Sequence, residues 1–196
     1  MLRRHPWVIA LALAAALLVV AGALVAQPFV IPSASMTPAL RPGDRVLVEK
    51  WDAADVRRGD VVVFEAPPGW GAEGGSTDYV KRVIGLPGDR VACCTHGAVT
   101  VDGQRLDEPY LHPGDRASTV HFDVRVPAHH LWVMGDHRSD SDDSRSHLGD
   151  PGGGMVPLDA VVGRVAYRYW PPDRVGAVPS APAPQTLRHQ PEAVAR

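Results

Sequence analysis

The sequence predicts a mainly β domain behind a single N-terminal transmembrane helix. Three observations support this prediction: one long apolar run near the N-terminus, short β-branched runs separated by Gly, Pro and Asp after it, and a Pro- and Ala-rich end. A chain of 196 residues is long enough for one substantial domain beside an anchor. The expected segments are an anchor over residues 1–28, a β domain over 29–170 and a disordered tail over 171–196.

The apolar run Trp7–Ala26 contains 20 uncharged residues and, as a helix, would span about 30 Å. Arg3 and Arg4 precede it, and the next basic residue is Arg41. The positive-inside rule therefore predicts a single-pass protein of the cytoplasmic membrane, with its N-terminus inside and the remaining chain on the extracytoplasmic face. A cleaved secretory signal is the alternative, because residues 21–23 resemble a small-x-small site, but secretory apolar cores are usually shorter.

The segment after the apolar run alternates β-branched runs with turn residues and has no long helical period. It also contains a Gly- and Pro-rich stretch, residues 66–77, that we expect to be an exposed loop. The predicted strands are Arg45–Glu49, Asp60–Glu65, Asp78–Ile84, Arg90–Ala92, Ala98–Val101, Thr119–Val126, His130–Met134 and Val161–Arg168.

Composition excludes several classes of function. The net charge is −2, which does not favour a nucleic-acid partner. Cys93 and Cys94 are adjacent and cannot cross-link distant elements, so we expect a structural or incidental role. His96 alone does not complete a ligand set with them, and we predict no metal and no cofactor. The basic residues are almost all Arg, with Lys50 and Lys81 as the two lysines.

Four segments stand in a characteristic order: Phe29–Leu40, Arg58–Phe64, Tyr79–Asp89 and Gly135–Arg145. They resemble the motif boxes of type I signal peptidases, and the resemblance covers about residues 29–170. It implies a signal-peptidase-like β catalytic domain. It also implies a serine endopeptidase that cleaves N-terminal signal peptides from exported pre-proteins after small-x-small sites such as Ala-x-Ala.

The resemblance implies Ser35 as the nucleophile and Lys81 as the general base. A serine hydroxyl is a poor nucleophile until a neighbouring base takes its proton. A lysine can act as that base only where desolvation lowers its pKa from about 10.4, and an arginine cannot act as one. The period of two in the predicted strand places Tyr79, Lys81 and Val83 on one face, which would supply a desolvating wall. Lys50 adjoins Glu49 and is expected at the surface.

Further roles follow from the resemblance alone. Ser33 is expected to donate its side-chain hydroxyl to the oxyanion together with the backbone N–H of the nucleophile, and a turn-capping hydroxyl is the alternative. Ser141 is expected to orient the lysine. Asp143 and Arg145 are expected to pair and hold their loop.

The last motif departs from the commoner family wording Gly-Asp-Asn-Arg-Asp-Asn-Ser at His137, Ser139 and Asp140. His137 beside Asp136 therefore raises a Ser/His/Asp alternative. We disfavour it, because adjacent residues of an extended segment point to opposite faces. The acidic residues of this motif do not have the spacing of a calcium-binding loop.

A signal peptide would lie as an added, extended strand with shallow pockets for alternate side chains. Ser35 follows the apolar run by nine residues, so the site lies within about 30 Å of the bilayer, and lipid is an expected partner. Each candidate wall residue of the groove is equally expected as ordinary β core. The candidates are Phe29, Ile31, Pro32, Met36, Leu40, Tyr79 and Val80.

Two other functions fit the sequence less well. A self-cleaving repressor-type Ser/Lys protease would be cytosolic and carry a DNA-binding module, whereas this chain has an apolar N-terminal run and no basic helix-turn-helix. A non-catalytic, membrane-tethered β domain that binds cell-envelope partners would not need both Ser35 and Lys81 in their motifs.

Overall fold

The computed structural model describes residues 26–50, 55–71, 77–94 and 97–181, together with Trp7, Val8, Leu11 and Leu13. Within these residues the chain forms two antiparallel β-sheets, one of eight strands and one of four. The prediction of a mainly β domain is confirmed.

The larger sheet runs in the order β1-β2-β11-β3-β4-β9-β10, and β12 pairs with β11 beside that path. Every pairing in it is antiparallel. Its strands are β1 (Ala26–Val30), β2 (Arg45–Glu49), β3 (Val61–Glu65), β4 (Asp78–Gly85), β9 (His130–Met134), β10 (Val156–Pro157), β11 (Val161–Trp170) and β12 (Gly176–Ala177).

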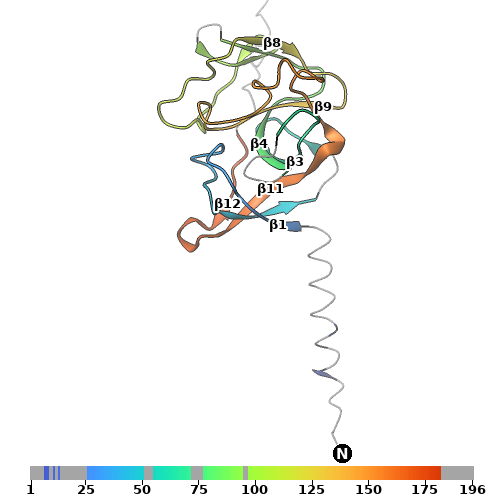
Figure 1. The fold of residues 1–196 in the computed structure, drawn as a ribbon. Coiled ribbons are helices and arrows are strands. Elements are labelled where there is room, and N and C mark those ends of the chain that lie inside the picture. The colour runs from blue at the N-terminus through green and yellow to red at the C-terminus, as the bar shows by residue number, and fades with distance from the viewer. Residues whose placement is uncertain are drawn as a thin grey trace, which may run out of the picture.

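The smaller sheet runs in the order β7-β6-β5-β8. Its strands are β5 (Arg90–Cys93), β6 (Thr100–Val101), β7 (Gln104–Arg105) and β8 (Phe122–Arg125), and two 3-10 helices flank β11, η3 (Leu158–Ala160) and η4 (Pro172–Arg174). Figure 1 shows β8 at the end of the molecule away from β1, β11 and β12. Gly85 lets the two sheets approach, because an added Cβ there would lie 2.5 Å from Val91 and 2.9 Å from Val126.

The core explains why β3 begins with four consecutive apolar residues and why seven of the eight residues of β4 are buried. Side chains alternate between the two faces of a strand, and both faces of these two central strands are covered. Val61, Val63 and Val80 join a cluster with Met36 and Leu40 from the loop between β1 and β2. Val62 and Phe64 join the cluster on the opposite face. A strand that is buried on both sides needs apolar residues at nearly every position.

The predicted N-terminal anchor lies largely outside the described residues. Trp7, Val8, Leu11 and Leu13 are helical and exposed. In the part of the chain that the structure describes, no helix is long and apolar enough to cross a bilayer. Ala26, the last residue of the apolar run, begins β1, so the β domain starts before the predicted boundary at Phe29.

The predicted tail also needs a correction. Residues 171–181 are ordered against the larger sheet: β12 pairs with β11, and Arg174 forms an ion pair with buried Asp44 at 2.8 Å. Val178 is buried, and Ala181 N–H donates to the carbonyl of Gly59. Residues 171–196 contain six prolines and little bulky apolar content, which predicts disorder. Residues 171–181 instead pack onto the core of the β domain, so they need no hydrophobic core of their own. Residues 182–196 lie outside the described residues.

The strand predictions agree well with the structure. Arg45–Glu49 and His130–Met134 match β2 and β9 residue for residue, and β3, β4, β5 and β11 differ by at most two residues at an end. The predictions for β6 and β8 were too long. Strands β1, β7, β10 and β12 were missed, because they are short or lie beside motif and proline residues.

Candidate active site

The central strand β4 carries Lys81 into the interior. Lys81 pairs in register with Val62 of β3, and its side chain is fully buried, with no exposed surface. Seven of the eight residues of β4 are buried. The strand therefore removes the lysine amine from water, which is the environment predicted for a lysine base.

The loop between β1 and β2 carries Ser35 to this lysine. The loop is closed by local hydrogen bonds, including Thr37 N–H to the Ala34 carbonyl and Leu40 N–H to the Met36 carbonyl. Met36 and Leu40 are buried and anchor the loop in the core. As a result, Lys81 Nζ donates a 2.8 Å hydrogen bond to Ser35 Oγ, across 46 residues of sequence, and Ser35 is only 4% exposed.

Ser33 lies on the other side of the Ser35 hydroxyl. The two side-chain oxygens are 3.1 Å apart, within hydrogen-bond distance, and Ser33 is half-buried. This contact brings together the three side chains that sequence analysis assigned to the reaction. The expected role of Ser33 as an oxyanion donor stays a prediction.

Aromatic side chains form one wall beside the lysine. Nζ of Lys81 lies 5.1 Å from the centroid of the Tyr79 ring. Tyr79 packs at 5.4 Å from Trp70 and 5.8 Å from Phe64, measured between ring centroids. The Tyr79 hydroxyl donates to the Gly71 carbonyl at 3.0 Å, so the polar end of the ring points toward the 66–71 loop. The predicted desolvating wall thus includes a loop that the sequence suggested to be merely exposed.

The acidic motif is organised around Asp143, which is buried completely. Arg145 donates to both of its carboxylate oxygens, at 2.8 and 2.7 Å. The Gly135 N–H and the Ser141 hydroxyl donate to the same carboxylate at 3.0 and 2.8 Å. Burial alone would raise the pKa of Asp143, but these hydrogen bonds and the charge of Arg145 outweigh it and hold the pKa below its usual value.

The structure contains the Asp143–Arg145 ion pair, and its role in holding the loop stays a prediction. Ser141 is bound to Asp143, and its orienting effect on Lys81 remains a prediction. The loop is positioned as one unit, because a single carboxylate collects hydrogen bonds from both ends of it.

Gly135 is a site residue whose role the sequence analysis did not predict. A Cβ at this position would lie 2.2 Å from Ser141 Oγ and 2.5 Å from the carbonyl oxygen of Ser35. The acidic loop, residues 135–145, and the nucleophile loop between β1 and β2 therefore both pack against Gly135. His137, two residues later, donates its backbone N–H to the same Ser35 carbonyl at 3.0 Å. A glycine between a strand of buried apolar residues and a polar motif was the available signal.

A second buried ion pair, Arg82 with Asp136, was also missed. Arg82 follows Lys81 on β4 and points to the other face, where it donates to both Asp136 oxygens at 2.7 Å. The Tyr110 ring lies 4.2 Å from the Arg82 guanidinium carbon. Arg138 makes a third buried pair, with Glu108. Sequence spacing could not reveal these pairs, because their partners come from distant segments.

The Ser/His/Asp alternative has no support in this geometry. The Asp136 carboxylate is bound to Arg82, whereas His137 Nδ1 lies 3.1 Å from Thr37 Oγ1. The two neighbours point apart, as expected for an extended segment. Lys50, the competing lysine, is exposed.

The candidate substrate-wall residues are mostly core. Tyr79, Met36, Ile31 and Leu40 are at most 2% exposed, and Val80 is 7% exposed. Phe29 is half-buried and Pro32 is exposed. Each residue was expected either to line the substrate groove or to pack in the β core, and the buried residues pack in the core clusters. Their contact with substrate stays a prediction.

Two further groups need a place in this description. Cys93 and Cys94 are joined by a disulfide at the end of β5, in agreement with the expectation that they cross-link no distant elements. His112, Asp115 and His137 form a cluster of potential metal ligands, which the sequence analysis did not foresee.

Comparison with known proteins places the chain among signal peptidases. Residues 4–170 match the family model described as signal peptidase, peptidase S26. The chain is 38% identical to signal peptidase I of Bacillus caldolyticus over 183 residues, which covers 86% of this chain and 91% of that protein. It is 35% identical to a probable signal peptidase I of Mycobacterium leprae over 214 residues, covering 82% and 74% respectively.

Among solved structures, a signal peptidase I from Enterococcus faecalis V583 matches with a TM-score of 0.44 and 25% sequence identity. The match covers 57% of this chain and 97% of that one.

Proposed function

The chain belongs to the peptidase S26 family of signal peptidases, and on this premise we propose that Ser35 and Lys81 are the catalytic dyad with which it cleaves signal peptides. It is a serine endopeptidase, and its substrates are pre-proteins that carry signal peptides. The observation that carries the assignment of the dyad is the buried 2.8 Å hydrogen bond between Lys81 Nζ and Ser35 Oγ.

The contact supports a direct proton transfer. A general base must lie within hydrogen-bond reach of the proton it takes, about 2.6–3.2 Å between heavy atoms. Neutral Lys81 takes the proton of Ser35, whose oxygen then attacks the scissile carbonyl. The amine returns this proton to the departing N-terminus of the mature protein. A water molecule, deprotonated by the same lysine, then hydrolyses the acyl-enzyme and frees the nucleophile.

The oxyanion that forms during both steps needs donors that are already in place. Ser33 is the candidate side-chain donor, because its hydroxyl lies 3.1 Å from the attacking oxygen. The backbone N–H of Ser35 is the candidate second donor. The Asp143 loop supports this arrangement from behind, since Gly135 and His137 both contact the Ser35 carbonyl.

Substrate would bind as an extended strand whose small side chains enter shallow pockets, and cleavage would follow a small-x-small sequence. The candidate pocket residues lie on the segments that carry the dyad, the nucleophile loop and β4, except Phe29, which lies in β1 just before that loop. Met36 and Tyr79 lie near the dyad but are buried, whereas Phe29 and Pro32 have exposed surface that a substrate could contact.

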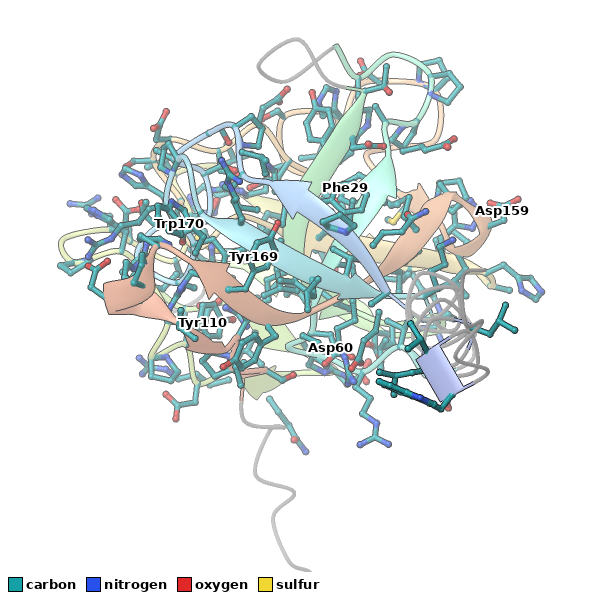
Figure 2. The ribbon with its side chains drawn as sticks, turned by 90° about the horizontal axis from the view of Figure 1, so that it is seen from below. Phe29, Asp60, Tyr110, Asp159, Tyr169 and Trp170 are labelled. Carbon is teal, nitrogen blue, oxygen red and sulfur yellow. A yellow bond between two sulfur atoms is a disulfide. The ribbon has the colours of Figure 1, made fainter. Side chains whose placement is uncertain are left out.

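The membrane arrangement is also part of the proposal. The apolar run Trp7–Ala26 would anchor the chain with its N-terminus inside, leaving the β domain on the outer face of the cytoplasmic membrane. Figure 2 shows Phe29, Tyr169 and Trp170 on the side of the domain formed by β1, β2 and β11. Trp170 is 48% and Tyr169 37% exposed, and such aromatic residues are typical of membrane interfaces.

The test uses the full chain in detergent and a pre-protein whose signal peptide ends in Ala-x-Ala, with the N-terminus of the product sequenced. We expect one cut directly after the second Ala. Ser35→Ala, which removes the nucleophile and little volume, should abolish the cut and keep the wild-type melting temperature. Cleavage by folded Ser35→Ala at the wild-type rate would refute the dyad. A cut by wild type at another sequence would refute the proposed specificity.

A further inference from the structure

Three potential metal ligands meet at the border of the proposed active site. One donor atom each from His112, Asp115 and His137 lies within 4.8 Å of the others, and all three residues are half-buried. Over residues 26–50, 55–71, 77–94 and 97–181, this is the one grouping of three such residues. The dyad reaction makes no use of them.

Backbone contacts hold the cluster together. Asp115 N–H donates to the His112 carbonyl at 3.0 Å, which closes a tight turn and brings both side chains to one place. His112 N–H donates to the carbonyl of Asp136 at 3.0 Å, so this turn is attached to the residue before His137. The two imidazole rings consequently stack, with centroids 3.9 Å apart.

Each end of the cluster also has supporting side-chain contacts. Thr37 Oγ1 lies 3.1 Å from His137 Nδ1, which orients that ring and leaves Nε2 as a ligand. Ser139 donates from its backbone N–H at 3.2 Å and from its hydroxyl at 2.7 Å to the Asp115 carboxylate. Hydrogen bonds of this kind orient the ligands in protein metal sites.

We propose that His112, Asp115 and His137 form a binding site for a divalent transition metal ion of the Zn²⁺ type. Two imidazole nitrogens and one carboxylate oxygen are a donor set that zinc accepts, with water in the fourth position. The ion requires ligands at about 2.0–2.2 Å, so its binding draws the three side chains inward from their present separation.

The site would act on the nucleophile loop and take no part in bond cleavage. His137 donates its backbone N–H to the Ser35 carbonyl at 3.0 Å, and its ring contacts Thr37, two residues after the nucleophile. An ion held by His137 would therefore tie the 112–115 turn to the loop that carries Ser35. Occupancy should stabilise the folded domain.

The experiment measures binding and stability, so its outcome does not depend on the dyad. The full chain in detergent is stripped of metal and titrated with Co²⁺, whose visible absorption reports nitrogen and oxygen coordination, and the Co²⁺ is then displaced with Zn²⁺. We expect one equivalent to bind. Zn²⁺ at about a hundred times its Kd should raise Tm by roughly 5–10 °C.

His112→Asn and His137→Asn each remove one ligand and should lower the affinity for Co²⁺ at least ten-fold and abolish the rise in Tm. His129→Asn is the matched control: His129 is exposed, is not part of the cluster, and has a φ of 61°, which asparagine tolerates. It should bind as wild type does. The proposal is overturned if Co²⁺ does not bind, or if both cluster variants, with melting temperatures near wild type before metal is added, bind it as wild type does.

Discussion

Lys81 combines two properties that no other described basic residue of the chain has. It is an amine, which can become neutral, and it has no exposed surface. Arg82, the next residue, is equally buried but points to the opposite face and is neutralised by Asp136. Adjacent positions of one strand thus carry a proposed base and a structural cation, and the alternation of side chains along β4 separates them.

Lys81→Arg should lower the processing rate by several orders of magnitude, because a guanidinium stays protonated and cannot take the proton of Ser35. The larger guanidinium could also disturb packing, so Lys81→Met is measured in parallel as an apolar variant of similar length. Both are compared with wild type for pre-protein cleavage and by thermal melting.

Lys50→Arg is the control, because Lys50 is exposed, and it should leave cleavage unchanged. The assignment of Lys81 as the base would be wrong if a folded Lys81→Arg or Lys81→Met enzyme retained more than a tenth of the wild-type rate.

Ser33→Ala should lower kcat by about 10²–10³, the cost of removing one oxyanion donor. KM should change little, since the donor acts mainly in the transition state. Steady-state kinetics with a peptide substrate measures both constants. Ser33→Thr, which keeps the hydroxyl, should recover part of kcat. An increase in KM with kcat unchanged would assign Ser33 to substrate binding instead.

The elements around the site are joined at positions that tolerate no added volume. Gly135 separates β9 from the acidic motif, and the carbonyl of Ser35 and the hydroxyl of Ser141 approach it from two loops. Asp143 then binds both Gly135 and Ser141. A strand end, the nucleophile loop and the acidic loop are therefore positioned by one another.

Gly135→Ala should push the nucleophile loop away, because its Cβ would lie 2.5 Å from the Ser35 carbonyl oxygen. Overpacking of this kind costs about 1–3 kcal/mol, which lowers Tm by several degrees. We expect a larger effect on kcat, because the displaced atom belongs to the proposed nucleophile. Gly149→Ala is the matched control, since nothing lies within 4 Å of an added Cβ there. Equal melting temperatures and rates for the two variants would contradict the close approach.

Asp143→Asn should lower the free energy of unfolding by about 3–5 kcal/mol at neutral pH, because it leaves the buried Arg145 charge without its partner. Since the folded state lowers the pKa of Asp143, this stabilisation is complete above the ordinary carboxyl pKa of about 3.9. It is lost as the pH falls through the lower folded-state value.

Urea unfolding of wild type and Asp143→Asn at pH 7, 5 and 3 measures the difference. The difference in the free energy of unfolding between the two proteins should be the same at pH 7 and pH 5 and smaller at pH 3. A difference that grows toward pH 3 would mean that the neutral form of Asp143 is the favoured one.

At the scale of the whole domain, residues 171–181 pack back onto the larger sheet. Residues 171–181 run from the end of β11 back to the turn before β3. Arg174 donates to Asp44 and to the carbonyl oxygens of Pro38 and Ala39 in the nucleophile loop. Ser180 donates to buried Asp60 at 2.8 Å. Residues 171–181 therefore help to support the site.

A chain that ends at Ala181 keeps all of these contacts and should melt and cleave as the full chain does. A chain that ends at Trp170 loses the Arg174–Asp44 pair, β12 and the Ser180 hydrogen bond. It should melt several degrees lower and cleave more slowly. Thermal melting and pre-protein cleavage of the two truncations test this, and equal behaviour of both would show that residues 171–181 contribute nothing.

Much of the β fold followed from local pattern. Runs such as Arg45–Glu49 and His130–Met134 have the β-branched composition and turn boundaries of strands, and their bounds were predicted correctly. The short strands β7, β10 and β12 contain two residues each and carry no periodicity of their own. Strands β10 and β12 form because the longer strands β9 and β11 offer free hydrogen-bonding groups, whereas β7 pairs with the equally short β6.

The sequence by itself determined the family, the mainly β class and the candidates Ser35, Lys81, Ser33 and Asp143. These depend on residue types and spacings within short motifs, which can be read directly from the sequence. Only the tertiary structure decided which groups meet. The pairs Arg82–Asp136 and Arg174–Asp44, the approach over Gly135 and the cluster of His112 with His137 all join segments far apart in sequence. Such contacts depend on how sheets and loops pack in three dimensions, and the spacing of residues along the sequence does not reveal which distant segments come together.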